Sequence, residues 1–137
     1  MQKSFYDRAV EYLRYKHVFD GIKEIKIVID YDVNFKDIVI QTNKKKYSYV
    51  IAKNLTDSVL KMSLIDKKIV AADTKENRNF LVKNWLNFTK IETLYIIFIN
   101  ITDKEPSIWS VNPHAQSKWS EIKNLKKLIT ALASKKV

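Results

Sequence analysis

Apolar residues recur every three or four positions over the first part of the chain, and the period then changes to two. The helical set consists of Phe5, Tyr6, Ala9, Val10, Leu13 and His17. Ser4 and Asp7 provide the N-cap signature that opens such a helix, and Gly21 fits the left-handed position that ends it. From Ile22 apolar residues alternate with charged ones, which predicts a half-buried strand.

A meander of three strands follows from the alternation and the turns. In the first strand Ile25, Ile27 and Ile29 point to one side. The later segments are a turn at 31–34, a strand at 37–42, a turn at 43–46 and a strand at 47–53. The third strand is apolar on both faces, which indicates a central position in the sheet. Short connections make the three strands antiparallel.

The second half of the chain alternates between helical and strand patterns. A helix begins at Thr56, and residues 69–72 fit either a helix or a short strand. Asp73 and Glu76 form a capping box that opens another helix. Residues 93–101 are rich in β-branched and aromatic side chains and predict a buried strand.

Two more elements complete the predicted order. Residues 108–111 fit a short edge strand, and Ser117 or Ser120 caps a final helix. The pattern predicts an α/β fold over residues 1–137, treated as a single domain. Its mixed sheet combines the N-terminal antiparallel three-stranded meander with a buried fourth strand and a short edge strand. A crossover helix between strands of such a sheet places helices on both faces.

Composition narrows the chemistry that this fold can perform. The 137 residues include one glycine and no cysteine, which excludes a glycine-rich phosphate loop, disulfides and thiolate sites. The two histidines are expected to be structural: His17 lies at the edge of the apolar helix face as a packed, hydrogen-bonded residue, and His114 lies in a polar turn. The charged N-terminal segment does not resemble a signal peptide, and no apolar run could cross a bilayer. We expect a cytoplasmic protein without a membrane partner.

Charge gives the strongest indication of function. Lysine and arginine number 25 against 15 acidic residues, for a formal net charge of +10. Such a balance favours a polyanionic partner, because each neutralised phosphate releases condensed counterions. The partner expected here is nucleic acid, with DNA favoured over RNA, and no cofactor is expected; the alternative is a lysine-rich surface that serves solubility alone. The lysines expected to contact phosphates are Lys44, Lys45, Lys46, Lys67, Lys68, Lys123, Lys126 and Lys127.

One pair of residues points to a known superfamily. Asp37 begins the second predicted strand and Lys53 ends the third, so an antiparallel pairing can make them neighbours. In the order of their predicted elements and in the segments KDIVI and KKKYSYVIAKN, residues 5–101 resemble the PD-(D/E)XK nuclease superfamily, the restriction-endonuclease-like fold. The resemblance implies an α-β-β-β-α-β core. It also implies that an aspartate on the second strand and an acid-x-lysine motif on the third bind a divalent metal and activate water.

The chain departs from that family at a metal-binding position. Asp37 matches the first acid and Lys53 the lysine, but Ile51 stands where the family has its second acid. A hard divalent cation needs several oxygen ligands, usually from more than one carboxylate. We therefore expect a nucleic-acid-binding or assembly protein on a nuclease-like scaffold without metal-dependent catalysis. The enzyme alternative is a nuclease using Mg²⁺ or Mn²⁺, in which Asp30 or Asp32 completes the site of Asp37 and Lys53.

Aromatic residues leave a further alternative open. Tyr47, Tyr49, Trp109 and Trp119 interleave with charge, as in a platform that stacks bases, although core packing also explains them. The two tryptophans flank an irregular segment at 112–114 and are expected to be partly exposed. In a protein-interaction module or homodimer without a nucleic-acid role, they and the last helix would form the contact.

Overall fold

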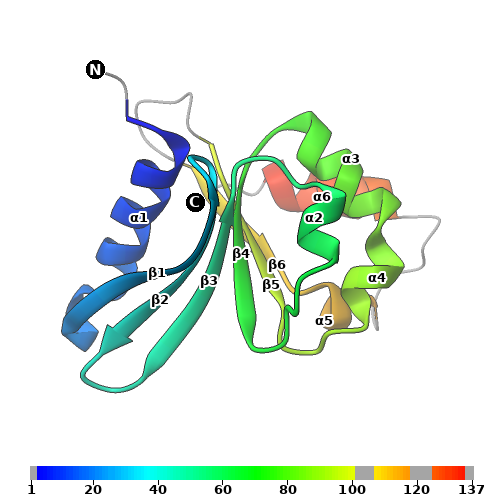
Figure 1. Ribbon diagram of the computed structural model, residues 1–137. Helices are drawn as coiled ribbons and strands as arrows, with labels where there is room; N and C mark the ends of the chain where they lie inside the picture. The colour runs from blue at the N-terminus through cyan, green and yellow to red at the C-terminus, as the bar shows by residue number, and fades with distance from the viewer. Residues whose placement is uncertain (1–2, 101–106, 118–124, 135–137) are drawn as a thin grey trace.

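A six-stranded mixed sheet with helices on both faces forms the fold (Figure 1). The computed structural model describes residues 3–100, 107–117 and 125–134. The strands are β1 (Ile22–Asp32), β2 (Phe35–Thr42), β3 (Lys46–Ala52), β4 (Lys67–Ala72), β5 (Tyr95–Ile99) and β6 (Ile108–Val111). The helices are α1 (Phe5–Lys16), the 3₁₀ helix η1 (Val18–Asp20), α2 (Asp57–Leu60), α3 (Lys75–Lys83), α4 (Trp85–Thr89), α5 (Pro113–Ser117) and α6 (Leu125–Ser134).

The strands lie side by side in their sequence order, from β1 to β6. β1, β2 and β3 form the antiparallel meander, β3, β4 and β5 are parallel, and β6 is antiparallel to β5. The predicted α/β class and the arrangement of the sheet are therefore confirmed. Residues 69–72, which fitted two kinds of element, belong to strand β4.

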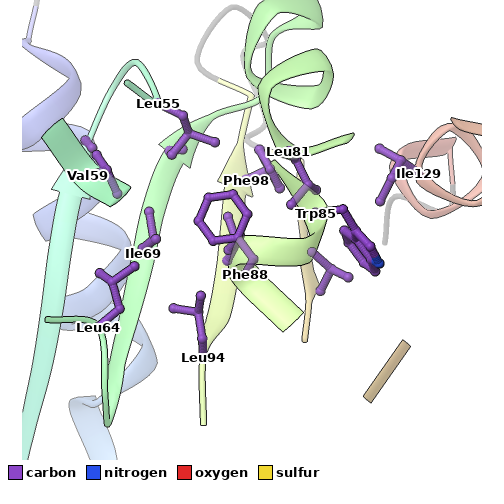
Figure 2. Packing of buried hydrophobic residues seen from close by; sticks show 14 of the residues in the cluster. Leu55, Val59, Leu64, Ile69, Leu81, Trp85, Phe88, Leu94, Phe98 and Ile129 are labelled. Carbon is purple, nitrogen blue, oxygen red and sulfur yellow. The ribbon is translucent and has the colours of Figure 1, made fainter. Parts of the chain in front are cut away.

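Two apolar clusters hold the helices on the two faces of the sheet. The larger one packs α2, α3, α4 and α6 against the sheet, and Figure 2 shows side chains of these helices, among them Leu81, Phe88 and Ile129, in the same cluster as Ile69 and Phe98 of the sheet. The smaller cluster packs α1 against the opposite face. Both clusters draw on the same central strands, because successive side chains of a strand leave the sheet on alternate faces. No helix in the described ranges is long and apolar enough to span a bilayer.

Helix α1 follows the sequence prediction closely. The Ser4 side chain accepts a hydrogen bond from the N–H of Asp7, and the buried residues of the helix are Phe5, Ala9 and Leu13. The helix ends at Lys16, earlier than expected, and η1 fills the gap to Gly21. Gly21 has the predicted left-handed conformation, with φ of 73°.

Strand β1 differs from its prediction in length and in facing. It continues to Asp32, through part of the expected turn. A register shift follows Ile27, which lies opposite Ile38, whereas Ile29 lies opposite Asp37. Because these two partners are consecutive in β2, Ile27 and Ile29 lie on opposite faces of the sheet rather than on one.

Three helical predictions also need correction. The helix expected from Thr56 is the short α2. Thr74, rather than Asp73, caps α3, since its side chain accepts from the N–H of Asn77. His114 lies in α5 rather than in a polar turn, because Pro113 favours a first helical position. Ser117, one of the two expected caps of the last helix, is the last residue of α5, and Ser120, the other, lies outside the described residues.

Candidate nucleic-acid interface

The register of the meander separates Asp37 from Lys53. Asp37 lies opposite Val50, whereas Lys53 follows the end of β3 and donates its N–H to the carbonyl of Asn34 at 3.0 Å. Lys53 lies beyond the end of β3 and three residues from Val50, so the register does not place it opposite Asp37. The register therefore gives Asp37 a different strand neighbour from the predicted Lys53: the meeting of two strand ends does not by itself set which residues lie opposite each other.

Asp37 instead forms a buried ion pair with Lys67. Lys67 Nζ donates to Asp37 Oδ2 at 2.7 Å, and only 5% of the Asp37 side chain is exposed. The lysine reaches across β3, because Lys67 begins β4 and Asp37 lies on β2. The pair lies in a cleft of about 400 Å³, which is also lined by Ile29, Tyr31, Ser58, Lys61, Met62 and Ser63. The lysine satisfies the buried carboxylate without a metal ion.

The acids proposed to complete a metal site have other partners. Asp30 is bonded to Lys36 at 2.5 Å, and Asp32 accepts the N–H of Asn34 within the turn at 2.8 Å. Lys36 and Asp37 are consecutive in β2, so Asp30 lies on the face away from Asp37. Within the described ranges no group of three or more His, Asp or Glu residues could hold a metal ion. This donor set does not fit the divalent metal that the nuclease resemblance implies.

A lysine-lined pocket lies at the end of the sheet where β3 and β4 begin. We call it the lysine pocket; its lining residues are Lys45, Lys46, Tyr47, Ser48, Tyr49, Asp66, Lys68 and Thr93. Its volume is about 380 Å³. The parallel register brings the two strand starts together, with Ser48 opposite Lys67. Three of the predicted phosphate-binding lysines, Lys45, Lys46 and Lys68, therefore meet around one opening.

The turn that carries the first two of these lysines is held by local hydrogen bonds. The Thr42 hydroxyl accepts from the N–H groups of Lys44 and Lys45 and donates to the Lys45 carbonyl. The N–H of Asn43 bonds to the carbonyl of Gly21 at 3.0 Å, which ties the turn to the end of η1. Gly21 has a φ of 73°, a left-handed conformation that other residues adopt only with strain, so this position favours glycine.

Positive charge is concentrated around the lysine pocket. Lys45 Nζ lies 4.8 Å from the centre of the Tyr47 ring, and Lys68 Nζ lies 5.6 Å from that of Tyr95. Partial burial, with the nearby ammonium of Lys68, lowers the pKa of Lys16. A bound anion would relieve the repulsion between these two lysines.

A buried histidine supports the wall of the pocket. His17 is 4% exposed, and its Nε2 lies 2.6 Å from the hydroxyl of Tyr49. Its ring also packs against Tyr47, with centroids 4.2 Å apart. Burial lowers the pKa of His17, while Asp20, 3.4 Å from Nδ1, acts in the opposite direction. The prediction that His17 is a packed, hydrogen-bonded residue is confirmed.

The remaining predicted lysines are not part of this pocket. Lys44 pairs with Asp20 at 3.1 Å, and Lys67 is held by Asp37. Lys126 and Lys127 are exposed on α6, which packs on the larger cluster beside α3. Figure 1 shows α6 far from the loop that joins β2 to β3. The last predicted residue, at position 123, lies outside the described residues.

The expected stacking aromatics are mostly buried. Trp109 is 6% exposed and stacks on Phe98 at 4.4 Å, so the prediction that it is partly exposed is wrong. Its position on β6 faces the larger cluster, and that packing covers it. Tyr49 is fully buried. Trp119 lies outside the described residues.

Two exposed aromatic residues were missed by the sequence analysis. Phe19 in η1 is 98% exposed, and Tyr15 near the end of α1 is 80% exposed. Phe19 adjoins Asp20, which pairs with Lys44 of the neighbouring turn. A single aromatic residue between a helix and a glycine belongs to no periodic face, so no pattern in the sequence marks it.

Comparison with known proteins does not assign this chain to a family. No family model matches the chain, and no curated protein matches it significantly. The function must therefore be argued from the site itself.

Proposed function

We propose that this chain binds nucleic acid through the phosphate backbone, with the lysine pocket as the central contact. The observation that carries the proposal is the convergence of Lys45, Lys46 and Lys68 on one opening. Within the part of the chain that the structure describes, none of the three is ion-paired to a carboxylate. Asp66 is the one carboxylate that lines the same pocket. The net charge of +10 adds long-range attraction for a polyanion.

The exposed ring of Phe19 supports a preference for nucleic-acid strands whose bases are unpaired. Phe19 lies beside the turn of the lysine pocket and has no covering neighbour over nearly its whole side chain. A base that stacks on an exposed aromatic ring contributes about 1–3 kcal/mol, and this is available only to unpaired bases. Lysines supply backbone affinity without reading sequence. The combination favours single-stranded nucleic acid over duplex, with DNA as the first substrate to test.

The scaffold is consistent with binding in the absence of hydrolysis. A helix, an antiparallel meander and a parallel strand reached through a helical crossover agree with the core that the PD-(D/E)XK resemblance implies. The carboxylates of Asp37 and Asp30, however, are each held by a lysine and lie on different faces of the sheet. A nuclease-like scaffold that retains binding but lacks the metal ligands accounts for both observations.

The salt dependence of binding tests the role of the pocket. Each single-strand phosphate contact contributes about 0.7 to the slope of log K against log salt. We expect K45A/K46A/K68A to reduce the affinity for a labelled single-stranded oligonucleotide and to lower that slope by about 2. Fluorescence anisotropy at a series of salt concentrations measures both quantities. Phe19→Ala should weaken binding to the single strand more than to a duplex of the same sequence.

A matched variant separates the pocket from net charge. K75A/K83A/K90A removes three exposed lysines from and near α3 and α4 and should leave the slope unchanged. Equal effects of the two triple variants, or no binding of the wild type at low salt, would contradict the proposal. Incubation of the wild type with plasmid and Mg²⁺ or Mn²⁺ tests the enzyme alternative, in which Asp37→Asn abolishes cleavage; we expect no cleavage.

A further inference from the structure

The edge strand β1 is long and uncovered. It has 11 residues, against about 5–6 for a typical strand, and only β2 pairs with it among the strands that the structure describes. The opposite edge, β6, has four residues. An edge strand presents a row of N–H and C=O groups that can pair with another strand, so proteins keep such edges short or covered.

The middle and the distal end of β1 expose apolar side chains. Val28 is 53% exposed and Ile29 is 44% exposed, and Ile27 and Tyr31 have similar values. Val33, in the turn after the strand, is 64% exposed. These residues form an apolar stretch on both faces at one edge of the sheet, which is typical of an interaction surface.

The charges along β1 identify a suitable partner. The first half carries Lys23 and Lys26 with one acid, Glu24, whereas the charged residues of the second half are Asp30 and Asp32. All five side chains are exposed. An antiparallel copy of the same strand, paired about Ile29, would place Lys26 of each chain opposite Asp32 of the other. The two side chains lie on one face of the sheet, because their partners in β2, Val39 and Phe35, are four residues apart. Opposite charges across a strand pair stabilise it, and like charges destabilise it.

We propose that β1 pairs antiparallel with β1 of a second copy of this chain, joining the two sheets through a twofold axis near Ile29. Such an interface is closed, because the same edge is used by both copies. Pairing of β1 with β6 of another copy would leave free edges and continue into a fibre. The proposal is independent of nucleic-acid binding. It places the two lysine pockets at opposite ends of the joined sheet, because the strands run in opposite directions.

Cysteine cross-linking tests the position of the axis. The chain has no cysteine, so Ile27→Cys, Val28→Cys and Ile29→Cys each introduce a single thiol. A disulfide requires Cα atoms about 4.4–6.8 Å apart, a separation found between opposite residues of paired strands. We expect mild oxidation to convert at least one of the three variants mainly into a covalent dimer of about 32 kDa, twice the mass of one chain.

A cysteine on the far helices is the control for random collision. Leu86→Cys, at a side chain on α4 that is 62% exposed, should remain monomeric under the same oxidation. Dimer formation by Leu86→Cys equal to that of the β1 variants would overturn the proposal. The same holds if none of the three β1 variants forms a dimer.

A charge reversal tests the same interface without cross-linking. Light scattering and sedimentation equilibrium should show a dimer of the wild type, and K23E/K26E should raise its dissociation constant at least about tenfold. K75E/K90E makes the same change of charge at two exposed lysines outside β1 and should leave the dimer intact. Circular dichroism confirms that each variant is folded. A wild type that stays monomeric at high concentration, or equal weakening by both double variants, would overturn the proposal.

Discussion

Strands β5 and β1 are built from similar residues and have opposite surroundings. β5 reads YIIFI, and four of its five side chains are buried. Residues 25–29 of β1 read IKIVI, yet Val28 and Ile29 are about half exposed. Branched apolar residues thus occupy both the centre and the edge of one sheet, and composition alone does not distinguish the two positions.

The difference between the two strands follows from how the chain enters and leaves them. β4 and β5 are parallel, so the chain returns between them through α3 and α4, which cover one face of the sheet. α1 packs on the opposite face against β3. β1 and β2 are joined by a turn, which adds no helix to cover them. The helices that connect two parallel strands therefore cover one face of those strands. The turn of a hairpin instead leaves the outer strand exposed unless a partner covers it.

The largest expected effect tests this contrast directly. Phe98 on β5 is fully buried and stacks on Trp109, so Phe98→Ala should lower the free energy of unfolding by about 3–5 kcal/mol. Val28→Ala on β1 should change it by less than about 1 kcal/mol at concentrations where the protein is monomeric. Urea denaturation measures both values. Comparable losses in the two variants would contradict the assignment of β5 to the core and β1 to a free edge.

In the covered half of the sheet the buried side chain of Asn77 forms three hydrogen bonds to the backbone, and its removal is expected to have the next largest effect on stability. Asn77 is 2% exposed; its Oδ1 accepts the N–H of Leu55, and its Nδ2 donates to the carbonyls of Lys53 and Ala72, each at 2.8 Å. The amide therefore ties α3 to the ends of β3 and β4. Asn77→Ala should destabilise the protein by about 2–3 kcal/mol, because the buried backbone groups would lose their partners.

An asparagine on the same helix is the matched control for this anchor. Asn79 is exposed on α3, so Asn79→Ala should change the stability by less than about 0.5 kcal/mol. Denaturation curves of the two variants give the comparison, and hydrogen exchange of the Leu55 amide reports on the lost contact. An Asn77→Ala protein as stable as Asn79→Ala would show that the three hydrogen bonds contribute little.

The fold could be predicted from the sequence wherever the hydrophobic pattern of a segment fits only one kind of secondary structure. The patterns of β2 and β3 and the apolar run of β5 each fit a strand alone. Residues 69–72 read IVAA, which satisfies both helical and strand periods, and the deciding fact is tertiary: they pair with β3 on one side and β5 on the other. The shift after Ile27 is equally hidden, because the isoleucines at 25, 27 and 29 keep a spacing of two residues through it.

Only the part of the candidate site that lies on the hairpin between β2 and β3 could be predicted from the sequence. Lys45 and Lys46 follow from the hairpin, whereas Lys68 joins them through the parallel register of β3 and β4. The ion pair of Asp37 with Lys67 was not predicted, because sequence shows which strand ends meet but not the register in which their residues pair. Contacts across non-consecutive strands, such as that between Asp37 and Lys67, leave no periodic signal in the sequence.

His17 is a buried titratable residue that contacts Tyr49 of the smaller cluster, and its titration sets the smallest of the expected effects. Burial is the main cause that lowers the pKa of His17 from its ordinary value of 6.5, and Lys16 and Lys68 lower it further. The contact with Asp20 opposes them. Below pH 6.5 the unfolded chain therefore binds a proton at this histidine more readily than the folded protein does. The stability that His17 contributes is complete above that pH and declines as the pH falls through the lowered pKa.

Urea denaturation between about pH 7.5 and about pH 5.5 covers the range in which histidine titrates. A single proton gives a slope of at most about 1.4 kcal/mol per pH unit, and we expect a smaller loss of stability toward acid pH in the wild type. His17→Gln keeps a polar group near Tyr49 and should flatten this dependence, whereas His114→Gln should retain it. If His114→Gln flattened the slope and His17→Gln did not, the acid sensitivity would belong to α5 on the covered half of the sheet. The histidine responsible for the acid sensitivity would then lie on the covered half of the sheet rather than beside the meander. This outcome would contradict the prediction, because the lowered pKa of His17 requires a neutral histidine that is buried against the meander.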